Sequence, residues 1–282
     1  MAAALRFDFV NICPSLLKIV YDPVSYRLYV LKEVPMVKGV LLAGGTGSRL
    51  YPLTRITNKH LLPIYDKPMV AYGVEALVKS GITDIMVVTG GTHAGEFLRL
   101  LSNGHEYGVD RLSYAYQDSA GGIAHALALA ERFVGDDQVM VLLADNIFEY
   151  SIASTIEQFK EQKDGARIIL APVEEEEHLH HLGVPELSDD GKVTAIIEKP
   201  SDPPSSYCVT GAYCYDASVF QIIKNLEPSA RNELEITDVN NYFIKDGTME
   251  YDIAKGFWGD AGESIDAYYV VNDYVRKFGA NK

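Results

Sequence analysis

The sequence predicts an α/β protein built on a doubly wound, mainly parallel (mixed) sheet with helices on both faces. The main observation is that strand-like and helix-like segments alternate from residue 37 onward, which is the pattern of parallel βαβ units. The strand-like segments are also continuous apolar runs, and this suits strands that are covered on both faces. A chain of 282 residues is long enough to bury a substantial core.

The expected elements are clearest between residues 37 and 150. A strand is expected at 37–43, where an apolar run is bounded by glycines. A helix is expected at 69–79, because the apolar spacing is helical and Ser80 and Gly81 follow it as a stop signal. Further strands are expected at 84–89, 112–116 and 139–144, and further helices at 93–101 and 123–133.

The pattern is looser from residue 151 to residue 282. Strands are expected at 166–171, 193–197, 207–215 and 249–253, and helices at 152–162, 217–225, 236–245 and 264–277. The most biased stretch runs from Glu174 to Glu177 and is followed by His178, His180 and His181. Histidines at these spacings could bind a metal ion, but we interpret the stretch as a solvated helical turn.

The first 35 residues differ from the rest of the chain. Two β-prone segments, at 16–20 and 26–34, flank Asp22-Pro23 and predict a hairpin. Met36 stands directly before the first buried strand, so residues 1–35 read as an extension without a catalytic role. Either a mis-called start site or a species-specific addition explains such an extension, and residues 36–282 then form a single domain.

The composition limits the partners and the compartment. Acidic side chains outnumber basic ones by 39 to 25, for a net charge of −14, so nucleic acid is not an expected partner. The cysteines Cys13, Cys208 and Cys214 show neither metal-ligand spacing nor a disulfide framework, which suits a reducing cytosol. No stretch reaches the roughly 20 apolar residues of a membrane span. Polar residues interrupt the apolar N-terminus, so we expect a cytoplasmic protein without a signal peptide.

A glycine-rich turn follows the first expected strand, with Gly44, Gly45 and Gly47 directly after the apolar run. Glycines in such a turn let backbone N–H groups approach phosphate oxygens closely. Residues 44–67 carry four basic side chains and one acidic one, so this segment is positive in an acidic chain. It therefore predicts a small phosphorylated ligand, and the alternative is a plain strand-to-helix turn.

Two familiar phosphate-binding motifs do not fit this turn. A dinucleotide fingerprint needs a third glycine at the position of Leu50. A P-loop needs Gly-Lys and then Ser or Thr, but Gly45 leads instead to Leu50 and Tyr51. The missing third glycine also disfavours a nicotinamide-dependent oxidoreductase.

Two aspartates are candidates for a metal site. Asp145 follows the apolar strand at 139–144, at the carboxyl end where open α/β sheets bind ligands. A carboxylate there suits Mg²⁺, which pairs with one or two carboxylates and with substrate phosphates. Asp260 lies between Gly259 and Gly262 and follows Trp258, which indicates a fixed turn that presents the carboxylate. The alternatives are a cap for Asp145 and a plain turn for Asp260.

Several motifs occur in a fixed order along the chain. They are Leu42-Ala43-Gly44-Gly45 with Gly47, Arg49, Leu50, Pro52 and Thr54, then Lys59 with residues 61–68, residues 117–122, Ala144-Asp145-Asn146, Glu198-Lys199-Pro200, Val209-Thr210-Gly211 and residues 233–240. In this order they resemble the sugar-1-phosphate nucleotidyltransferases, and most of all the short glucose-1-phosphate thymidylyltransferases. The resemblance covers residues 36–277 and implies a Rossmann-like nucleotidyltransferase fold, with a nucleotide-binding part at 37–150 and a sugar-phosphate-binding part at 151–282.

The resemblance also implies roles for individual residues. The nucleotide would be bound by Leu42, Gly44, Gly45, Gly47, Arg49, Lys59, Gln117 and Gly122, with Arg49 and Lys59 on its phosphates and Gln117 and Gly122 on its base. The sugar phosphate would be bound by Asn146, Gly183, Glu198, Lys199 and Val209, and Mg²⁺ by Asp145 and Asp260. The catalytic residues would be Arg49, Lys59, Asp145 and Lys199. His60 is a departure, because many members carry Gln there.

The implied reaction joins dTTP and glucose 1-phosphate into dTDP-glucose and pyrophosphate, with Mg²⁺ as cofactor. No general base is needed, because the attacking phosphate oxygen is already anionic at pH 7. Two alternatives stay open: the same chemistry with UTP or another sugar 1-phosphate, and a nucleotide-sugar sensor without catalysis. The presence of Arg49, Lys59, Asp145, Lys199 and Asp260 together argues against the sensor. A homo-oligomer also stays open.

Overall fold

The computed structural model describes residues 17–22, 27–32, 36–162 and 164–282, and the chain divides into two units, at residues 1–36 and 37–282. In the first unit, β1 (Leu17–Asp22) and β2 (Arg27–Lys32) pair antiparallel, with Leu17 opposite Lys32. The expected hairpin is therefore confirmed as a strand pair. The turn expected at Pro23 lies outside the described residues.

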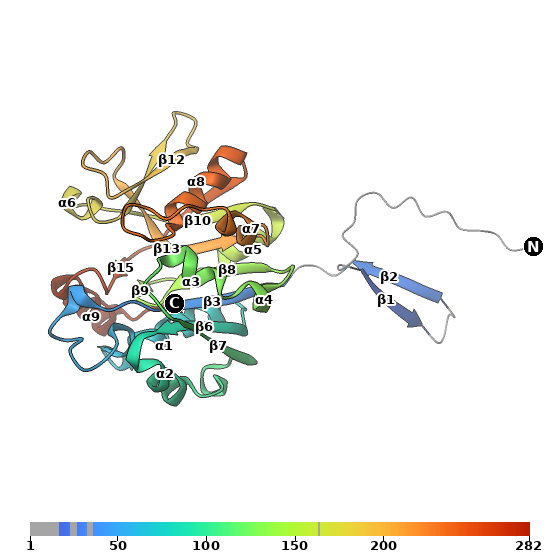
Figure 1. Ribbon diagram of the computed structural model, residues 1–282, viewed down its shortest axis with the longest axis horizontal. Coiled ribbons are helices and arrows are strands. Elements are labelled where there is room, and N and C mark those ends of the chain that lie inside the picture. The colour runs from blue at the N-terminus through green and yellow to red at the C-terminus, as the bar shows by residue number, and fades with distance from the viewer. Residues whose placement is uncertain (1–16, 23–26, 33–35, 163) are drawn as a thin grey trace, which may run out of the picture. The chain divides into compact units, whose positions relative to one another are not determined.

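The second unit is built around a mixed sheet with the strand order β14-β10-β13-β8-β3-β6-β7 (Figure 1). Its strands are β3 (Val37–Ala43), β6 (Asp84–Gly90), β7 (Arg111–Gln117), β8 (Gln138–Leu143), β10 (Ala166–Pro172), β13 (Tyr207–Tyr215) and β14 (Met249–Ile253). All neighbouring strands pair parallel except at β13, which is antiparallel to both β8 and β10. The predicted doubly wound, mainly parallel sheet is confirmed.

Helices cover both faces of this sheet. The helices of the described residues are α1 (Met69–Lys79), α2 (Ala94–Leu101), α3 (Ile123–Ala128), α4 (Glu131–Val134), α5 (Ala153–Gln162), α6 (Glu176–Leu179), α7 (Val219–Lys224), α8 (Ile236–Asp246) and α9 (Ile265–Phe278). Side chains from α3, α7 and α8 pack with Val40 and Leu42 of β3 in one cluster, and side chains from α1, α2 and α5 pack with Leu41 and Ala43 in another. The two faces follow from the period of two along a strand.

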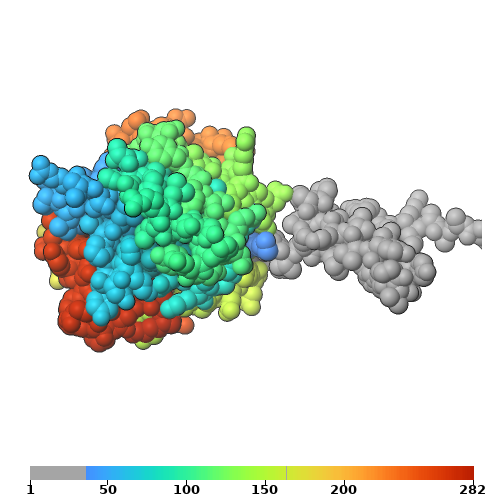
Figure 2. All heavy atoms as spheres, turned by 90° about the horizontal axis from the view of Figure 1, so that it is seen from below, coloured from blue at the N-terminus to red at the C-terminus, as the bar shows by residue number. Residues whose placement is uncertain are grey.

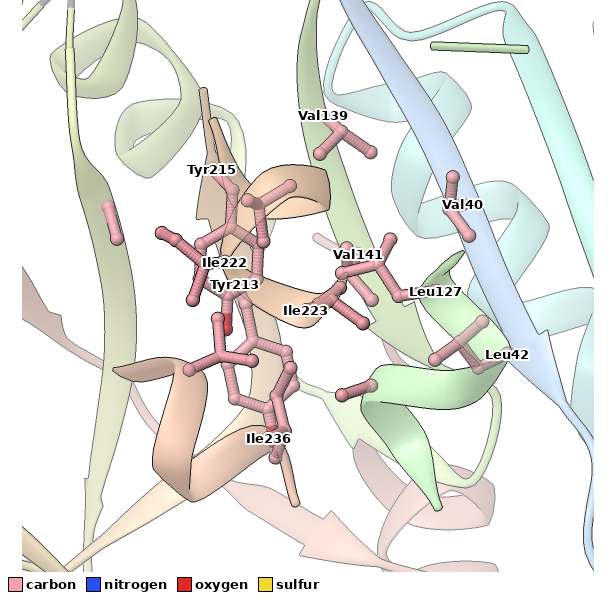
Figure 3. Packing of buried hydrophobic residues seen from close by; sticks show 14 of the residues in the cluster. Val40, Leu42, Leu127, Val139, Val141, Tyr213, Tyr215, Ile222, Ile223 and Ile236 are labelled. Atoms are coloured by element: carbon pink, nitrogen blue, oxygen red, sulfur yellow. The ribbon is translucent and has the colours of Figure 1, made fainter. Parts of the chain in front are cut away.

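Figure 3 shows the first of these clusters, in which the labelled residues are Val40, Leu42, Leu127, Val139, Val141, Tyr213, Tyr215, Ile222, Ile223 and Ile236. On the other face, α1 lies very close to β3. A Cβ at Gly73 would be only 2.6 Å from Cδ1 of Leu41, so this helix keeps a glycine in its interior despite a cost of about 1 kcal/mol relative to alanine. The close approach fixes α1 beneath the strand that leads into the glycine-rich turn.

The structure corrects two helix expectations. The helix expected at 123–133 is two helices, α3 and α4, because the chain tightens between them: Ala130 N donates to Leu127 O at 2.9 Å in a three-residue turn. This tightening turns Ala130 and Val134 together into the core, where both are fully buried. The helix expected at 93–101 begins as a 3₁₀ turn at Gly91–His93, and α2 starts only at Ala94.

Short strand pairs that the sequence analysis did not predict flank the large sheet. They are β4 (Pro63–Ile64) with β5 (Lys67–Pro68), β9 (Asn146–Phe148) with β15 (Trp258–Asp260), and β11 (Gly183–Leu187) with β12 (Val193–Glu198), of which only β12 was expected. The β11–β12 hairpin and α8 lie together at the end of the unit opposite α2 (Figure 1).

The C-terminal helix α9 lies beside the segment that follows β3. Figure 2 shows this segment, in blue, next to the red C-terminal residues. Tyr65 N donates to Asn272 Oδ1 at 2.7 Å, and the Tyr268 hydroxyl donates to the carbonyl of Pro63. No helix among the described residues has both the length and the apolar run that a membrane crossing requires.

Candidate active site

A cavity of about 410 Å³ opens at the carboxyl ends of β3 and β8, where open α/β sheets bind ligands. Its lining includes every site residue expected from the sequence, namely Leu42, Gly44, Gly45, Gly47, Arg49, Lys59, Gln117, Gly122, Asp145, Asn146, Gly183, Glu198, Lys199, Val209 and Asp260. Residues separated by more than 200 positions in the chain thus face one space.

The glycine-rich turn forms one wall of this cavity. Gly47 has φ +65°, and a Cβ there would lie 2.9 Å from Cγ2 of Thr54, so both the backbone and the packing require glycine. The Thr54 hydroxyl donates to the carbonyl of Gly47 at 2.8 Å and fixes the turn. Arg49 follows in a 3₁₀ turn and is exposed, which leaves its guanidinium available to an anion in the cavity.

Lys59 and two carboxylates form the charged centre of the cavity. The Lys59 ammonium donates to Asp145 Oδ2. Burial alone would lower the pKa of Lys59, but Asp145 and Asp260 raise it above its usual value. Burial would likewise raise the pKa of Asp145, but the Lys59 charge holds it well below its usual range. Lys59 is therefore charged and Asp145 ionised at neutral pH.

Asp260 is the less compensated of the two carboxylates. Burial and the neighbouring Asp145 charge raise the pKa of Asp260 to about 7. The loop after it is tied to Asp145, because Ala261 N donates to the Asp145 carbonyl at 2.9 Å and Gly262 N donates to Asp260 Oδ1 at 2.8 Å. A Cβ at Gly262 would collide with Asp145 Oδ2 and Lys59 Nζ. The centre therefore holds two acids against one lysine and gains from added positive charge.

His60 lies directly behind this centre. Its main-chain N donates to Asn58 Oδ1 at 2.9 Å, and its Nδ1 lies 2.9 Å from the same oxygen. Burial and the Lys59 charge lower the pKa of His60 to about 3, so the ring is neutral at pH 7. Its Nε2 is 3.8 Å from Asp145 Oδ2. His60 thus adds bulk beside the lysine–aspartate pair without adding charge.

Asn146 has its side-chain orientation fixed by three hydrogen bonds. Its Oδ1 accepts from Gly211 N at 2.7 Å and from Trp258 Nε1 at 2.8 Å. Its Nδ2 donates to Asp145 Oδ1 at 3.2 Å. Since Nδ2 carries two hydrogens, the amide can offer its second one to a ligand. Breaking this arrangement would leave a buried amide oxygen without its donors, at a cost of roughly 1–3 kcal/mol.

Gln117 ends β7 beside the glycine-rich turn, and its side chain is also fixed. Its Nε2 donates to the Gly122 carbonyl at 3.2 Å and lies 3.1 Å from His125 Nδ1. Its Oε1 is on the side of Gly44, where a Cβ would come within 3.0 Å of it. The amide therefore presents its acceptor oxygen toward the glycine-rich turn.

The far wall comes from the second half of the chain. Glu198 ends β12 and accepts from the Thr237 hydroxyl at 2.7 Å, and Arg231 Nη2 lies 3.3 Å from Glu198 Oε1 and 2.8 Å from Glu235 Oε2. Lys199 has φ +47°, a left-handed conformation that costs a non-glycine residue about 1–3 kcal/mol. These side chains give the wall two cations, with Arg231 and Lys199 both within ion-pair distance of Glu198.

The profile of the nucleotidyl transferase family matches residues 38–277. The chain belongs to the nucleotidyl transferase family. Among curated relatives, the glucose-1-phosphate thymidylyltransferase of Neisseria meningitidis serogroup A is 42% identical over 229 residues, which are 80% of this chain and 78% of that protein.

Solved structures of nucleotidyl transferases share the fold. A Bacillus anthracis protein assigned as a glucose-1-phosphate thymidylyltransferase, crystallised with sucrose, aligns with a TM-score of 0.81 at 46% identity and covers 88% of this chain and 98% of its own. UDP-glucose pyrophosphorylase in complex with UDP-glucose aligns with a TM-score of 0.72 at 25% identity, covering 86% and 99% of the two chains.

Nucleotidyl transferases generally use a divalent metal ion. Among the described residues, no group of three or more His, Cys, Asp or Glu side chains is placed to hold one. The histidine-rich stretch forms the short helix α6, and His180 Nδ1 lies 2.8 Å from the Pro200 carbonyl, as expected for a turn. Asp145 and Asp260, the two carboxylates expected from the sequence as metal ligands, both line the cavity.

Several cavity residues of this nucleotidyl transferase were not predicted as site residues. Arg231, Thr237, Trp258 and Gly262 are among them. The sequence offered a signal for the last two, because Trp258 and Gly262 flank Asp260, and for Thr237, which lies within the motif at 233–240. Arg231 lies just before that motif and had no signal of its own.

Proposed function

We propose that this nucleotidyl transferase moves a thymidylyl group from dTTP to glucose 1-phosphate, giving dTDP-glucose and pyrophosphate. One observation carries the proposal: the residues expected for the nucleotide and those expected for the sugar phosphate line one cavity. The hydrogen-bonded pair of Lys59 and Asp145 lies at the centre of that cavity. The family, the N. meningitidis relative and the B. anthracis structure support this reaction.

The nucleotide would lie along the wall made by residues 37–150. The backbone N–H groups of the glycine-rich turn and the exposed Arg49 suit the triphosphate, because both can approach anionic oxygens closely. Lys59 is within reach of the same phosphates, and it is already held in its charged form. Leu42 and Gly122 would then contact the nucleoside, since both line the cavity.

The sugar phosphate would lie along the wall made by residues 151–282. Lys199 and Arg231 supply the positive charge that its phosphate needs. Glu198 and Asn146, which both line the cavity, would supply hydrogen-bond partners for sugar hydroxyls. The carboxylates of Glu198 and Glu235 keep Arg231 in place.

Asp145 and Asp260 fit Mg²⁺ as its protein ligands. Mg²⁺ takes oxygen ligands and is usually held by one or two carboxylates together with substrate phosphates, and this pair is the donor set that the cavity offers. The raised pKa of Asp260 indicates that the pair lacks positive charge, which a divalent cation would provide. When bound, Mg²⁺ would neutralise charge on the phosphate oxygens of the nucleotide.

The chain's own residues would catalyse by positioning and by charge neutralisation. An oxygen of the sugar phosphate attacks the α-phosphorus in line, the bond from that phosphorus to the pyrophosphate oxygen breaks, and pyrophosphate leaves. Arg49 and Lys59 would stabilise the departing pyrophosphate, and Lys199 would offset repulsion between the two anions. No proton has to move, because the attacking oxygen is ionised at pH 7, so held geometry and fixed charge supply the catalysis.

The orientation of Gln117 supports a preference for thymine or uracil. Both bases present an N3–H donor, which the Gln117 Oε1 acceptor can pair with. Cytosine has an unprotonated N3 at this position, so its N3 acceptor would face the Oε1 acceptor of Gln117 with no proton between them. The donors on Nε2 already bond Gly122, so the amide does not turn over freely. UTP is therefore the second candidate nucleotide, and the shared fold with UDP-glucose pyrophosphorylase favours keeping it.

The proposed function is tested by measuring pyrophosphate release with dTTP, UTP, CTP, ATP and GTP, each combined with several hexose 1-phosphates in Mg²⁺ buffer. We expect the highest kcat/KM for dTTP with glucose 1-phosphate. Asp145→Asn, purified in the same way, serves as the matched control, because a large fall in its pyrophosphate release ties the activity to this cavity. Pyrophosphate release that does not depend on a sugar 1-phosphate, or none with any pair, would overturn the proposal.

A further inference from the structure

Glu149 lies just beyond the strand pair β9–β15, outside the lining of the large cavity. The residue is only 9% exposed, yet its carboxylate is well satisfied. Oε2 accepts from Phe257 N at 3.0 Å and from the Tyr274 hydroxyl at 2.5 Å, and Oε1 accepts from Lys282 Nζ at 2.8 Å. A buried carboxylate with three donors is held in one place.

These bonds close the end of a very short ribbon. Glu149 N also donates to the Phe257 carbonyl at 2.9 Å. Both the main chain and the side chain of Glu149 therefore bond Phe257, the residue directly before β15. From there the ribbon runs through Trp258↔Phe148 and Gly259↔Ile147 to Asp260↔Asn146. The Glu149–Phe257 pair thus continues the same register that places Asp260 opposite Asn146 at the cavity.

The register of this ribbon decides where the Asp260 carboxylate points. Side chains alternate between the two faces of a strand, so a slip by one residue would turn Asp260 to the opposite face. That face is closed by α9, because a Cβ at Gly259 would lie 2.6 Å from Cγ2 of Val271. A slipped ribbon would therefore lose the carboxylate from the cavity.

The ribbon needs support from outside itself. An isolated two-stranded ribbon is marginally stable at best, and this one has only three paired positions. On the side of α9, Ile147 packs with Val271. This contact is apolar, so it has no preferred direction and does not by itself fix the register. At the open end, Asn281 N and Lys282 N donate to the carbonyls of Phe148 and Glu149 at 2.9 Å and hold β9 from its other side. The bonds between Glu149 and Phe257 are the ones at this end that join β9 to the chain entering β15, and Phe257 stacks on Tyr274 with ring centroids 3.9 Å apart.

We propose that Glu149 is a positioning residue that fixes the register of the β9–β15 ribbon and so holds the Asp260 carboxylate beside Asp145. This role rests on the proposed function, in which Asp260 binds the divalent cation that accompanies the nucleotide. Glu149 itself touches neither substrate nor metal. Its effect is transmitted by the strand pair, and it is specific to the part of nucleotide affinity that depends on the metal.

The test measures the affinity for the α,β-methylene analogue of dTTP by isothermal titration calorimetry, once with Mg²⁺ and once with EDTA. The dissociation constant in EDTA divided by the one in Mg²⁺ gives the contribution of the metal to nucleotide affinity, and it is measured without any turnover. Glu149→Met keeps the length of the side chain and removes both acceptor oxygens. We expect it to lower this ratio about fivefold to thirtyfold while the affinity in EDTA changes less than twofold.

A double-mutant cycle separates positioning from general destabilisation. Asp260→Asn removes the ligand charge, so Glu149→Met should add no further loss of metal contribution in that background. Lys282→Met is the matched control, because it removes a charged donor from Oε1 and leaves the bonds of Oε2 to the ribbon intact; its ratio should stay within twofold of the wild type. If Glu149→Met does not fold, Tyr274→Phe removes one donor from Oε2, keeps the ring stack and should lower the ratio in the same direction.

The possible results distinguish the two hypotheses. A wild-type protein that does not bind the analogue refutes the proposed function, and the positioning role falls with it. A wild-type protein with a metal contribution that Glu149→Met leaves unchanged refutes the positioning role alone. The same holds if Glu149→Met weakens binding equally with Mg²⁺ and with EDTA, or if its loss persists in the Asp260→Asn background.

Discussion

Gly262→Ala is predicted to damage the charged centre of the cavity with little effect on the fold. The backbone at Gly262 is not left-handed, so alanine is allowed there, but its Cβ would lie 2.7 Å from Lys59 Nζ and even closer to Asp145 Oδ2. Ordinary van der Waals contact begins at 3.4 Å, so the Lys59 ammonium must retreat by about 0.7 Å and the carboxylate by more. The added methyl group acts on the two side chains that we place at the phosphates.

The size of the effect follows from this displacement. A misplacement of about 1 Å at a reacting centre can cost roughly 10²-fold, so we expect kcat for pyrophosphate release to fall about tenfold to a hundredfold. Gly95→Ala is the matched control, because that glycine lies in α2 and, within the part of the chain that the structure describes, an added Cβ would meet nothing within 4 Å beyond its own helix backbone and its chain neighbours. It should leave kcat unchanged and raise the free energy of unfolding by about 0.4–1 kcal/mol.

Two results of this experiment would refute the reasoning. A Gly262→Ala protein with wild-type kcat and wild-type Tm would show that Lys59 and Asp145 need not keep their present positions. A Gly262→Ala protein whose Tm falls so far that it is partly unfolded at the assay temperature would place the loss of activity in the fold instead of the site. Thermal unfolding of both alanine variants is therefore measured beside the kinetics.

Three further predictions concern charge and hydrogen bonding. Asp145→Asn and Asp260→Asn should each lower kcat by roughly 10²–10³-fold, since each removes a charge from the proposed Mg²⁺ site, and near-wild-type turnover at saturating Mg²⁺ would exclude the residue concerned. Wild-type protein should prefer dTTP over CTP by about tenfold or more in kcat/KM, and Gln117→Ala should bring that ratio toward one; an unchanged ratio would show that another group selects the base. Acid should weaken the fold through Glu149, because its bonds to Lys282 and other donors lower its pKa from the ordinary 4.5 to about 2. Since the folded pKa is the lower one, this stabilisation is present above about pH 4.5 and is lost as the pH falls toward 2, so the Tm difference between wild type and Glu149→Gln should shrink across that window.

The sequence predicted those parts of the fold that depend on local pattern. The strand at 37–43 and the helix at 69–79 have the predicted bounds, because a continuous apolar run defines the first and a Ser-Gly stop signal ends the second. The strands at 207–215 and 249–253 also have the predicted bounds. The short strands β9 and β15 were not predicted. Each has only three residues, and each exists because the other lies beside it, more than a hundred residues away in the chain.

The candidate site divides in the same way. Its individual residues were predicted from motifs, and all of them line one cavity. The motifs could not show that Lys59 pairs with Asp145, that Gly211 and Trp258 orient Asn146, or that Arg231 reaches Glu198. These are contacts between distant segments, and they arise from tertiary packing, to which no local periodicity corresponds.

The claim that two anions bind on opposite walls is tested most directly by the kinetics of Arg49→Ala and Lys199→Ala. KM is measured for dTTP and for glucose 1-phosphate in both variants. We predict that Arg49→Ala raises KM for dTTP roughly tenfold or more with little change for glucose 1-phosphate, and that Lys199→Ala does the reverse. The opposite assignment, or equal effects of both variants on both substrates, would contradict the arrangement of the cavity described above.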